Sequence, residues 1–150
     1  MIIKLKKINK DAIVPTYAHE TDAGADLYAN ETVVLYPGER HAVRTGIAID
    51  IPQGFVGLIH SRSGLAANKG LSVLNAPGTI DAGYQGELKV ILYNSDPYLP
   101  AEINKGDRIA QLVLQEFKQM NFELVEDFSI TSDRGQGGLG STGLWASMYF

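Results

Sequence analysis

A bend rich in glycine leads into alternating apolar residues in the stretch Gly78-Thr-Ile-Asp-Ala-Gly-Tyr-Gln-Gly-Glu-Leu-Lys-Val-Ile-Leu92. Glycine tolerates backbone angles that other residues avoid, so the sequence predicts a sharply bent hairpin over residues 78–86. Leu88, Val90 and Leu92 then recur at every second position, which is typical of a strand with one buried face. The stretch therefore favours a β-rich fold.

The same alternation recurs in other parts of the chain, at Ile3 and Leu5, at Ile47, Ile49 and Ile51, and at Leu112 and Leu114. Turn signals separate these runs, at Tyr36–Gly38, Ile51–Gly54, Ala76–Gly78 and Ser95–Pro97. The best helical candidate is Ser63–Lys69, with Ser63 as a possible N-cap and Gly70 as a C-terminal stop. The sequence therefore predicts an all-β fold with at most one short helix.

Composition limits the kind of protein this can be. The chain of 150 residues fits one domain, residues 1–150, and it has no cysteine for a disulfide, a thiolate zinc site or a cysteine nucleophile. A cytoplasmic location is expected, because a chain without cysteine suits a reducing compartment and no apolar run is long enough for a membrane span. Thirteen basic and seventeen acidic residues give a net charge of −4, which disfavours nucleic acid polymers as partners.

Asp81 and Tyr84 form the first candidate reaction centre. A carboxylate that is ionised at neutral pH can accept a proton from water, and a nearby aromatic ring can pack on a sugar or a base. The alternatives are a turn residue for Asp81 and a core or hairpin residue for Tyr84.

A second candidate is the glycine-rich segment Gly135-Gln-Gly-Gly-Leu-Gly-Ser-Thr-Gly143. Its glycines match a dinucleotide fingerprint, but too few residues follow to complete the βαβ unit that this fingerprint needs. Closely spaced backbone amides, two hydroxyl groups and Arg134 could still bind a phosphate. The alternative is a disordered tail, and the residues alone leave both open.

Five segments in this order resemble the five motifs of the trimeric dUTPases: Ala23–Ala29, Ser61–Ala66, Asn75 with Gly78–Glu87, Gly106–Leu112 and Arg134–Gly143. The resemblance runs from about residue 22 to residue 143. It implies a dUTPase-like distorted jelly-roll β-barrel with a flexible C-terminal arm at about residues 131–150. It also implies a homotrimer whose active sites are shared between chains, and hydrolysis of dUTP to dUMP and pyrophosphate with Mg²⁺ bound to the triphosphate.

The resemblance gives a role to each motif. Asp81 corresponds to the general base that activates the attacking water, and Tyr84 to the residue that packs on deoxyribose. Asp26 corresponds to the acid that holds hydrated Mg²⁺ through a water. The residues of the uracil-reading hairpin correspond to Asn75, Gly78, Thr79, Ile80 and Lys89.

The remaining motif residues are implied to bind phosphate or to close the site. Phosphate contacts correspond to Arg62, Ser63, Gly64 and Gln111. The closing arm corresponds to Arg134, Gly138, Leu139, Ser141 and Thr142. Leu139 is a departure, because the family usually has an aromatic residue there that stacks on uracil. Asp107 and Arg108 are expected to form a structural or intersubunit pair.

Two other functions remain as alternatives. A dCTP deaminase shares the fold and the phosphate motifs but needs a glutamate downstream of the hairpin, where this sequence has Ile91. A non-catalytic nucleotide-binding trimer would not need Asp81. A zinc hydrolase is disfavoured, because His19, His41 and His60 lack the spacing of metal ligands.

Overall fold

The computed structural model describes residues 1–128 and Gly135, and its internal contacts divide the chain into two units, residues 1–118 and 119–150. All regular secondary structure of the described chain lies in the first unit. In the second unit, residues 119–128 follow an irregular path. The arm expected at about residues 131–150 lies outside the described residues, apart from Gly135.

Short strands make up most of the regular secondary structure of the first unit, and the expectation of an all-β fold with one short helix is confirmed. In chain order the elements are β1 (Lys4–Lys7), β2 (Gly24–Tyr28), β3 (Val33–Leu35), β4 (Arg40–Arg44), β5 (Ile47–Asp50), β6 (Phe55–His60), α1 (Ser63–Lys69), β7 (Leu71–Val73), β8 (Gly78–Ile80), β9 (Lys89–Asn94), β10 (Ala101–Ile103) and β11 (Arg108–Glu116).

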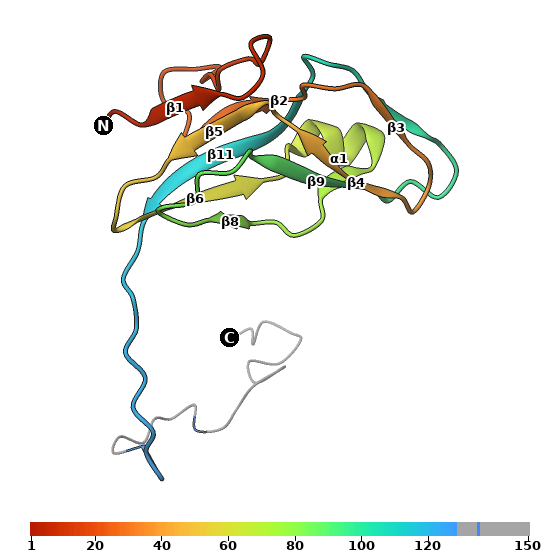
Figure 1. The fold of residues 1–150 in the computed structure, drawn as a ribbon. Coiled ribbons are helices and arrows are strands. Elements are labelled where there is room, and N and C mark those ends of the chain that lie inside the picture. Colours follow the sequence, from red (N-terminus) through yellow and green to blue (C-terminus); the bar gives the residue numbers. More distant parts are fainter. Residues whose placement is uncertain (129–134, 136–150) are drawn as a thin grey trace, which may run out of the picture. The chain divides into compact units, whose positions relative to one another are not determined.

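The strands pair antiparallel in two larger sheets and two ribbons (Figure 1). One sheet has the strand order β2-β11-β6-β8, and the other has the order β4-β9-β7. The ribbons are β1-β5 and β3-β10. Neighbouring strands in the sheets are distant in sequence, so the fold depends on long-range pairing rather than on consecutive hairpins.

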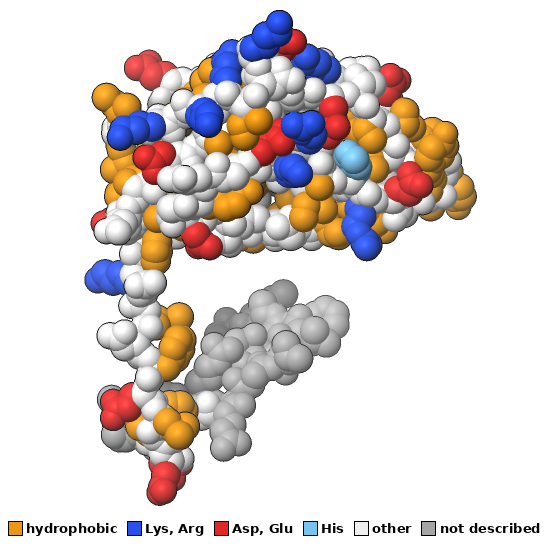
Figure 2. Space-filling model, viewed as in Figure 1, with side chains coloured by type: hydrophobic (Ala, Val, Ile, Leu, Met, Phe, Trp, Pro, Cys, Tyr) orange, Lys and Arg blue, Asp and Glu red, His pale blue; other side chains and the backbone are white. Residues whose placement is uncertain are grey.

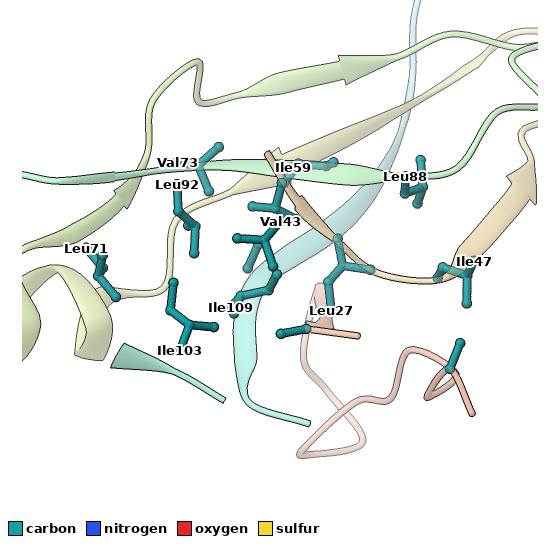
Figure 3. Packing of buried hydrophobic residues seen from close by; sticks show 14 of the residues in the cluster. Leu27, Val43, Ile47, Ile59, Leu71, Val73, Leu88, Leu92, Ile103 and Ile109 are labelled. Atoms are coloured by element: carbon teal, nitrogen blue, oxygen red, sulfur yellow. The ribbon is translucent and has the colours of Figure 1, made fainter. Parts of the chain in front are cut away.

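Buried side chains from both sheets meet in one interior (Figure 3). In β9, Val90, Leu92 and Asn94 are buried and alternate with more exposed neighbours, as the period-two pattern predicts. Leu27, Val43 and Ile109 join them from β2, β4 and β11. Each of these apolar side chains contributes about 1.5–3 kcal/mol on burial, so this interior is the main source of stability. On the surface, Figure 2 shows side chains of both charges interspersed on the visible face of the first unit.

The prediction of a hairpin over residues 78–86 is wrong in one respect. β8 pairs with β6, whereas β9 pairs with β4 and β7, so the stretch crosses from one sheet to the other. The tight bend itself is confirmed, because the Tyr84 N–H donates to the Asp81 carbonyl at 3.2 Å and Gly83 has a φ of 87°. The Leu88 N–H donates to the Ile47 carbonyl at 2.8 Å, which directs the chain into the second sheet.

The predicted helix Ser63–Lys69 is confirmed, and it ends at Gly70 in the left-handed conformation with a φ of 63°. The prediction of Ser63 as N-cap is wrong. Arg62 occupies that position with an extended backbone, and its carbonyl already accepts from the Leu65 and Ala66 N–H groups. Ser63 is therefore the first helical residue. The part of the chain that the structure describes contains no helix that could span a bilayer.

The turn between β9 and β10 gives a prediction on pH and stability. The Asp96 carboxylate accepts from the Tyr98 N–H at 2.8 Å and from the Leu99 N–H at 2.9 Å. These two bonds stabilise the ionised form and lower the pKa of Asp96 below its ordinary value. A lowered pKa in the folded state adds stability above the unfolded pKa, near 4, and this stability is lost as the pH falls through the folded value.

Asp96→Asn removes this titration but keeps an oxygen that can accept both bonds. The wild type is therefore expected to be more stable than the variant at pH 7, and the difference is expected to shrink between about pH 5 and pH 3. Urea unfolding of both proteins across this range measures it. A difference in the free energy of unfolding that stays constant with pH would contradict a lowered pKa for Asp96 in the folded protein.

Candidate active site

The described site residues fall into two groups, and the first surrounds a cavity of about 420 Å³ at the crossover between the sheets. Five of its lining residues were predicted from the sequence: Thr79, Ile80, Asp81, Tyr84 and Lys89. The other lining residues are Ala42, Glu87, Leu88 and Ile91. The cavity thus brings together the proposed base, the aromatic residue and three residues of the uracil-reading segment.

Asp81 and Tyr84 owe their positions to the tight bend after β8. Asp81 is exposed, and within the described chain no hydrogen bond or ion pair occupies its carboxylate. Tyr84 is 46% exposed, and its hydroxyl donates to the main-chain carbonyl of Glu87 at 3.1 Å. The carboxylate is therefore open to a water molecule, while the ring is held from the far side of the loop.

Gly78 lies close to the side chain of Asn75. It is buried in β8, where it pairs with Ile59, and an added Cβ would lie 3.3 Å from Nδ2 of Asn75. Asn75 and Gly78 are therefore neighbours, although neither lines the cavity. Ile91 does line it, with an apolar side chain.

The second group centres on Asp26 in β2, which is 2% exposed. Nε of Arg62 lies 3.2 Å from Asp26 Oδ1, and Nη1 of Arg108 lies 3.7 Å from Oδ2. Arg62 Nη1 also donates to the Arg108 carbonyl at 3.0 Å. Gln111 lies opposite Asp26 in the pairing of β11 with β2. Ser63 and Gly64 follow Arg62 as the first, exposed residues of α1.

The position of Arg108 next to Asp26 was not predicted. Asp107 and Arg108 bind separate partners within one copy, since Asp107 Oδ2 accepts from the Asn104 N–H at 2.8 Å. A bulge between Arg108 and Ala110 places Arg108 opposite Tyr28 and Gln111 opposite Asp26. Without this extra residue, Arg108 and Gln111 would point to opposite faces of the sheet. The bulge therefore puts both on the Asp26 face.

The environment of Asp26 fits an indirect role in holding a metal. Its Oδ1 is buried and accepts no hydrogen bond of acceptable geometry within the described chain. No group of three or more acidic, histidine or cysteine side chains among the described residues could hold a metal by itself. A cation such as Mg²⁺, which keeps several waters and binds substrate phosphates, suits one such carboxylate acting through water.

The two groups remain separate within one copy. No hydrogen bond or ion pair among residues 1–128 connects Asp81 or Tyr84 with Asp26, Arg62 or Gln111. The predicted arm residues lie outside the described part of the chain: Arg134, Gly138, Leu139, Ser141 and Thr142. The described residues therefore form two groups that make no direct polar contact with each other within one copy of the chain.

Comparisons with known proteins identify the family. The family model described as dUTPase matches residues 10–143. The deoxyuridine 5'-triphosphate nucleotidohydrolase of Thermobifida fusca is 55% identical over 141 residues, which cover 94% of this chain and 78% of that protein. The protein of the same name from Nocardia farcinica is 56% identical over 146 residues, which cover 97% of this chain and 88% of that protein.

Solved structures agree with the family match. The dUTPase of Staphylococcus bacteriophage 80alpha with dUPNHPP has a TM-score of 0.89 and 35% identity, covering 95% of this chain and 99% of that one. A mutant dUTPase from phage phi11 of S. aureus, described with a structural Mg(II) ion, has a TM-score of 0.80 and 32% identity, covering 87% of this chain and 100% of that one. The jelly-roll β fold expected from the sequence is confirmed, and the chain belongs to the dUTPase family as a dUTP diphosphatase.

Proposed function

We propose that this enzyme hydrolyses dUTP to dUMP and pyrophosphate, with Asp81 activating the water that attacks the α-phosphorus. The observation that carries the proposal is the cavity at the crossover, where an exposed carboxylate and an aromatic ring meet a main-chain segment suited to reading a base. A carboxylate is in general a weak base, so the contribution of Asp81 depends on holding the water in line with the phosphorus.

Tyr84 is proposed to select the sugar. Its ring packs against deoxyribose and leaves no room for a 2′-hydroxyl. Close steric contact is needed, because an apolar pocket alone rejects an added hydroxyl only about 100-fold. The position of Tyr84 on the wall of the Asp81 cavity supports this role.

The Asp26 group is proposed to bind the triphosphate. Arg62, Ser63, Gly64 and Gln111 offer charged and neutral donors to phosphate oxygens, as the resemblance implies. Asp26 would hold hydrated Mg²⁺ through a water, while its buried Oδ1 also lies 3.2 Å from Nε of Arg62. When bound to the triphosphate, Mg²⁺ neutralises phosphate charge.

A homotrimer with shared sites is proposed to complete the centre. Within the described part of one copy, the Asp26 group and the Asp81 group make no direct polar contact. As the resemblance implies, the Asp26 group of one chain would face the Asp81 group of another across the substrate. Arg134, Gly138, Leu139, Ser141 and Thr142 would close over the substrate and exclude bulk water. In the cytoplasm such an enzyme would limit uracil incorporation into DNA and supply dUMP for thymidylate synthesis.

Product identification tests the proposed reaction. The purified protein is incubated with Mg²⁺ and, separately, with dUTP, dTTP, dCTP or UTP, and both products are identified. We expect dUMP and pyrophosphate from dUTP, with the other nucleotides turned over far more slowly. Phosphate instead of pyrophosphate would place the attack on another phosphorus. Ammonia from dCTP would favour the deaminase, and binding of dUTP without turnover would favour the non-catalytic trimer.

Leu139 gives a separate prediction, although it lies outside the described residues. An aromatic residue at this place would stack on uracil, whereas leucine can cover the base only by apolar contact. Leu139→Phe is therefore expected to lower KM for dUTP several-fold with little change in kcat. Steady-state kinetics measures this, and an unchanged KM would exclude Leu139 as the residue that covers the base.

A further inference from the structure

We propose that Glu87 is a positioning residue that fixes the Tyr84 ring and thereby sets the preference for deoxyribose over ribose. This inference rests on the sugar-selecting role proposed for Tyr84. Glu87 follows the bend that carries Asp81 and Tyr84, and it lines the same cavity. Its carboxylate, however, contacts Arg44 at the end of β4 and Gly46 in the connection between β4 and β5.

The Glu87 carboxylate anchors the loop to this connection. Its side chain is 11% exposed, Oε1 accepts from the Gly46 N–H at 2.9 Å, and Oε2 lies 3.1 Å from Nε of Arg44. Gly46 is buried, so its N–H would lose its acceptor without this side chain. Buried amides are nearly always paired, which makes the Gly46–Glu87 bond a specific attachment point.

The connection that receives Glu87 is itself held rigidly. Gly46 has a φ of 71°, and an added Cβ would lie 2.7 Å from Nδ2 of Asn30 and 2.9 Å from Cβ of Ala12. Glu31 fixes the end of β4, because its Oε1 accepts from the Arg44 N–H at 2.7 Å. Glu87 therefore attaches a loop to a part of the fold that has little freedom to move.

Tyr84 depends on the main chain that Glu87 anchors. Its hydroxyl donates to the Glu87 carbonyl at 3.1 Å, and an added Cβ at Gly86 would collide with its ring. Leu88 is tied independently, since its carbonyl accepts from Oγ1 of Thr45 at 2.6 Å. The Glu87 side chain is thus the first fixed point after the exposed bend, and we infer that the Tyr84 ring takes its position from it.

This arrangement predicts a change in specificity rather than a loss of the reaction. Rejection of a 2′-hydroxyl depends on steric contact, and a small displacement of the ring opens space for one more oxygen atom. Movement of Asp81 is limited separately by the pairing of β8 with β6. Loss of the Glu87 attachment is therefore expected to weaken sugar discrimination more than it slows turnover of dUTP.

The test compares kcat and KM for dUTP and UTP in the wild type and in variants. Glu87→Ala is expected to raise the ratio of kcat/KM for UTP to that for dUTP about 10-fold, with KM for dUTP rising more than kcat falls. Glu87→Gln keeps an oxygen that can accept the Gly46 N–H, so it is expected to restore most of the discrimination. Arg44→Met, which removes the exposed partner and leaves the Gly46 bond, is expected to behave like the wild type.

The variant Tyr84→Ala distinguishes sugar selection by Tyr84 from the positioning of Tyr84 by Glu87. If Tyr84→Ala raises the ratio and Glu87→Ala does not, Tyr84 selects the sugar but Glu87 does not position it, and the inference is overturned. If Tyr84→Ala leaves the ratio unchanged, the proposed role of Tyr84 fails and the inference fails with it. Should Glu87→Ala not fold, Glu87→Asp replaces it, because the shorter side chain cannot span the same distance to Gly46. Wild-type discrimination in Glu87→Asp would then overturn the inference.

Discussion

Asp81→Asn is expected to lower kcat for dUTP hydrolysis by about 100- to 10,000-fold while dUTP binding changes little. Asparagine has nearly the same size and can still hold a water by hydrogen bonding, but it cannot take a proton at neutral pH. Asp81 is exposed, and the described chain offers it no side-chain partner, so the folded structure should tolerate the substitution.

Two measurements distinguish this chemical effect from a structural one. Single-turnover kinetics reports the chemical step, and equilibrium binding of a non-hydrolysable dUTP analogue reports recognition. Asp50→Asn is the matched control, because Asp50 is an exposed carboxylate in β5, opposite Lys4. Wild-type turnover in Asp81→Asn would exclude Asp81 as the base, whereas a similar loss in Asp50→Asn would indicate a general effect of charge.

Mixing two inactive variants is expected to restore activity. If each site takes Asp81 from one chain and Arg62 from another, a site is intact when an Arg62→Gln chain supplies its Asp81 and an Asp81→Asn chain supplies its Arg62. Random assembly of equal amounts of the two chains would leave about a quarter of the sites with both contributors intact. Co-expressed chains should therefore have clear activity, although each variant alone has almost none.

The mixed trimers are isolated with two different affinity tags, and their activity is compared with that of each variant purified alone. Simply combining the purified variants on ice is the control, since chains that do not exchange cannot complement each other. Inactive mixed trimers would show that the Asp81 group and the Arg62 group of one chain serve the same site. Such a result would overturn the shared-site proposal while leaving the role of Asp81 intact.

Local patterns in the sequence predicted local structure well. The alternation of Val90 and Leu92 correctly indicates a strand with one buried face, and the segment Ser63–Lys69 is helical up to Gly70. Periodicity and the left-handed preference of glycine act within a few residues, so a single sequence contains the necessary information. The N-cap could not be assigned in this way, because Arg62 and Ser63 are both compatible with the first turn.

Features that depend on distant pairing could not be predicted. The stretch around Asp81 was expected to be a hairpin, but hydrogen bonds of Leu88 with Ile47 and Thr45 direct it to another sheet. The bulge before Ala110 has no sequence signature here, and it decides that Arg108 reaches Asp26. The site residues themselves came from the family motifs, whereas the attachment of Glu87 to Gly46 required the structure.

The crossover between the two sheets makes the loop of Asp81 a mechanical link. One end of this loop is fixed to β6 through β8, and the other end is fixed to the β4–β5 connection through Glu87 and Leu88. Any sliding of one sheet over the other must therefore be absorbed by residues 81–86. A substrate held by Asp81 and Tyr84 would limit the sliding of the two sheets. Binding in the cavity would therefore reduce the mobility of strands that do not contact the nucleotide.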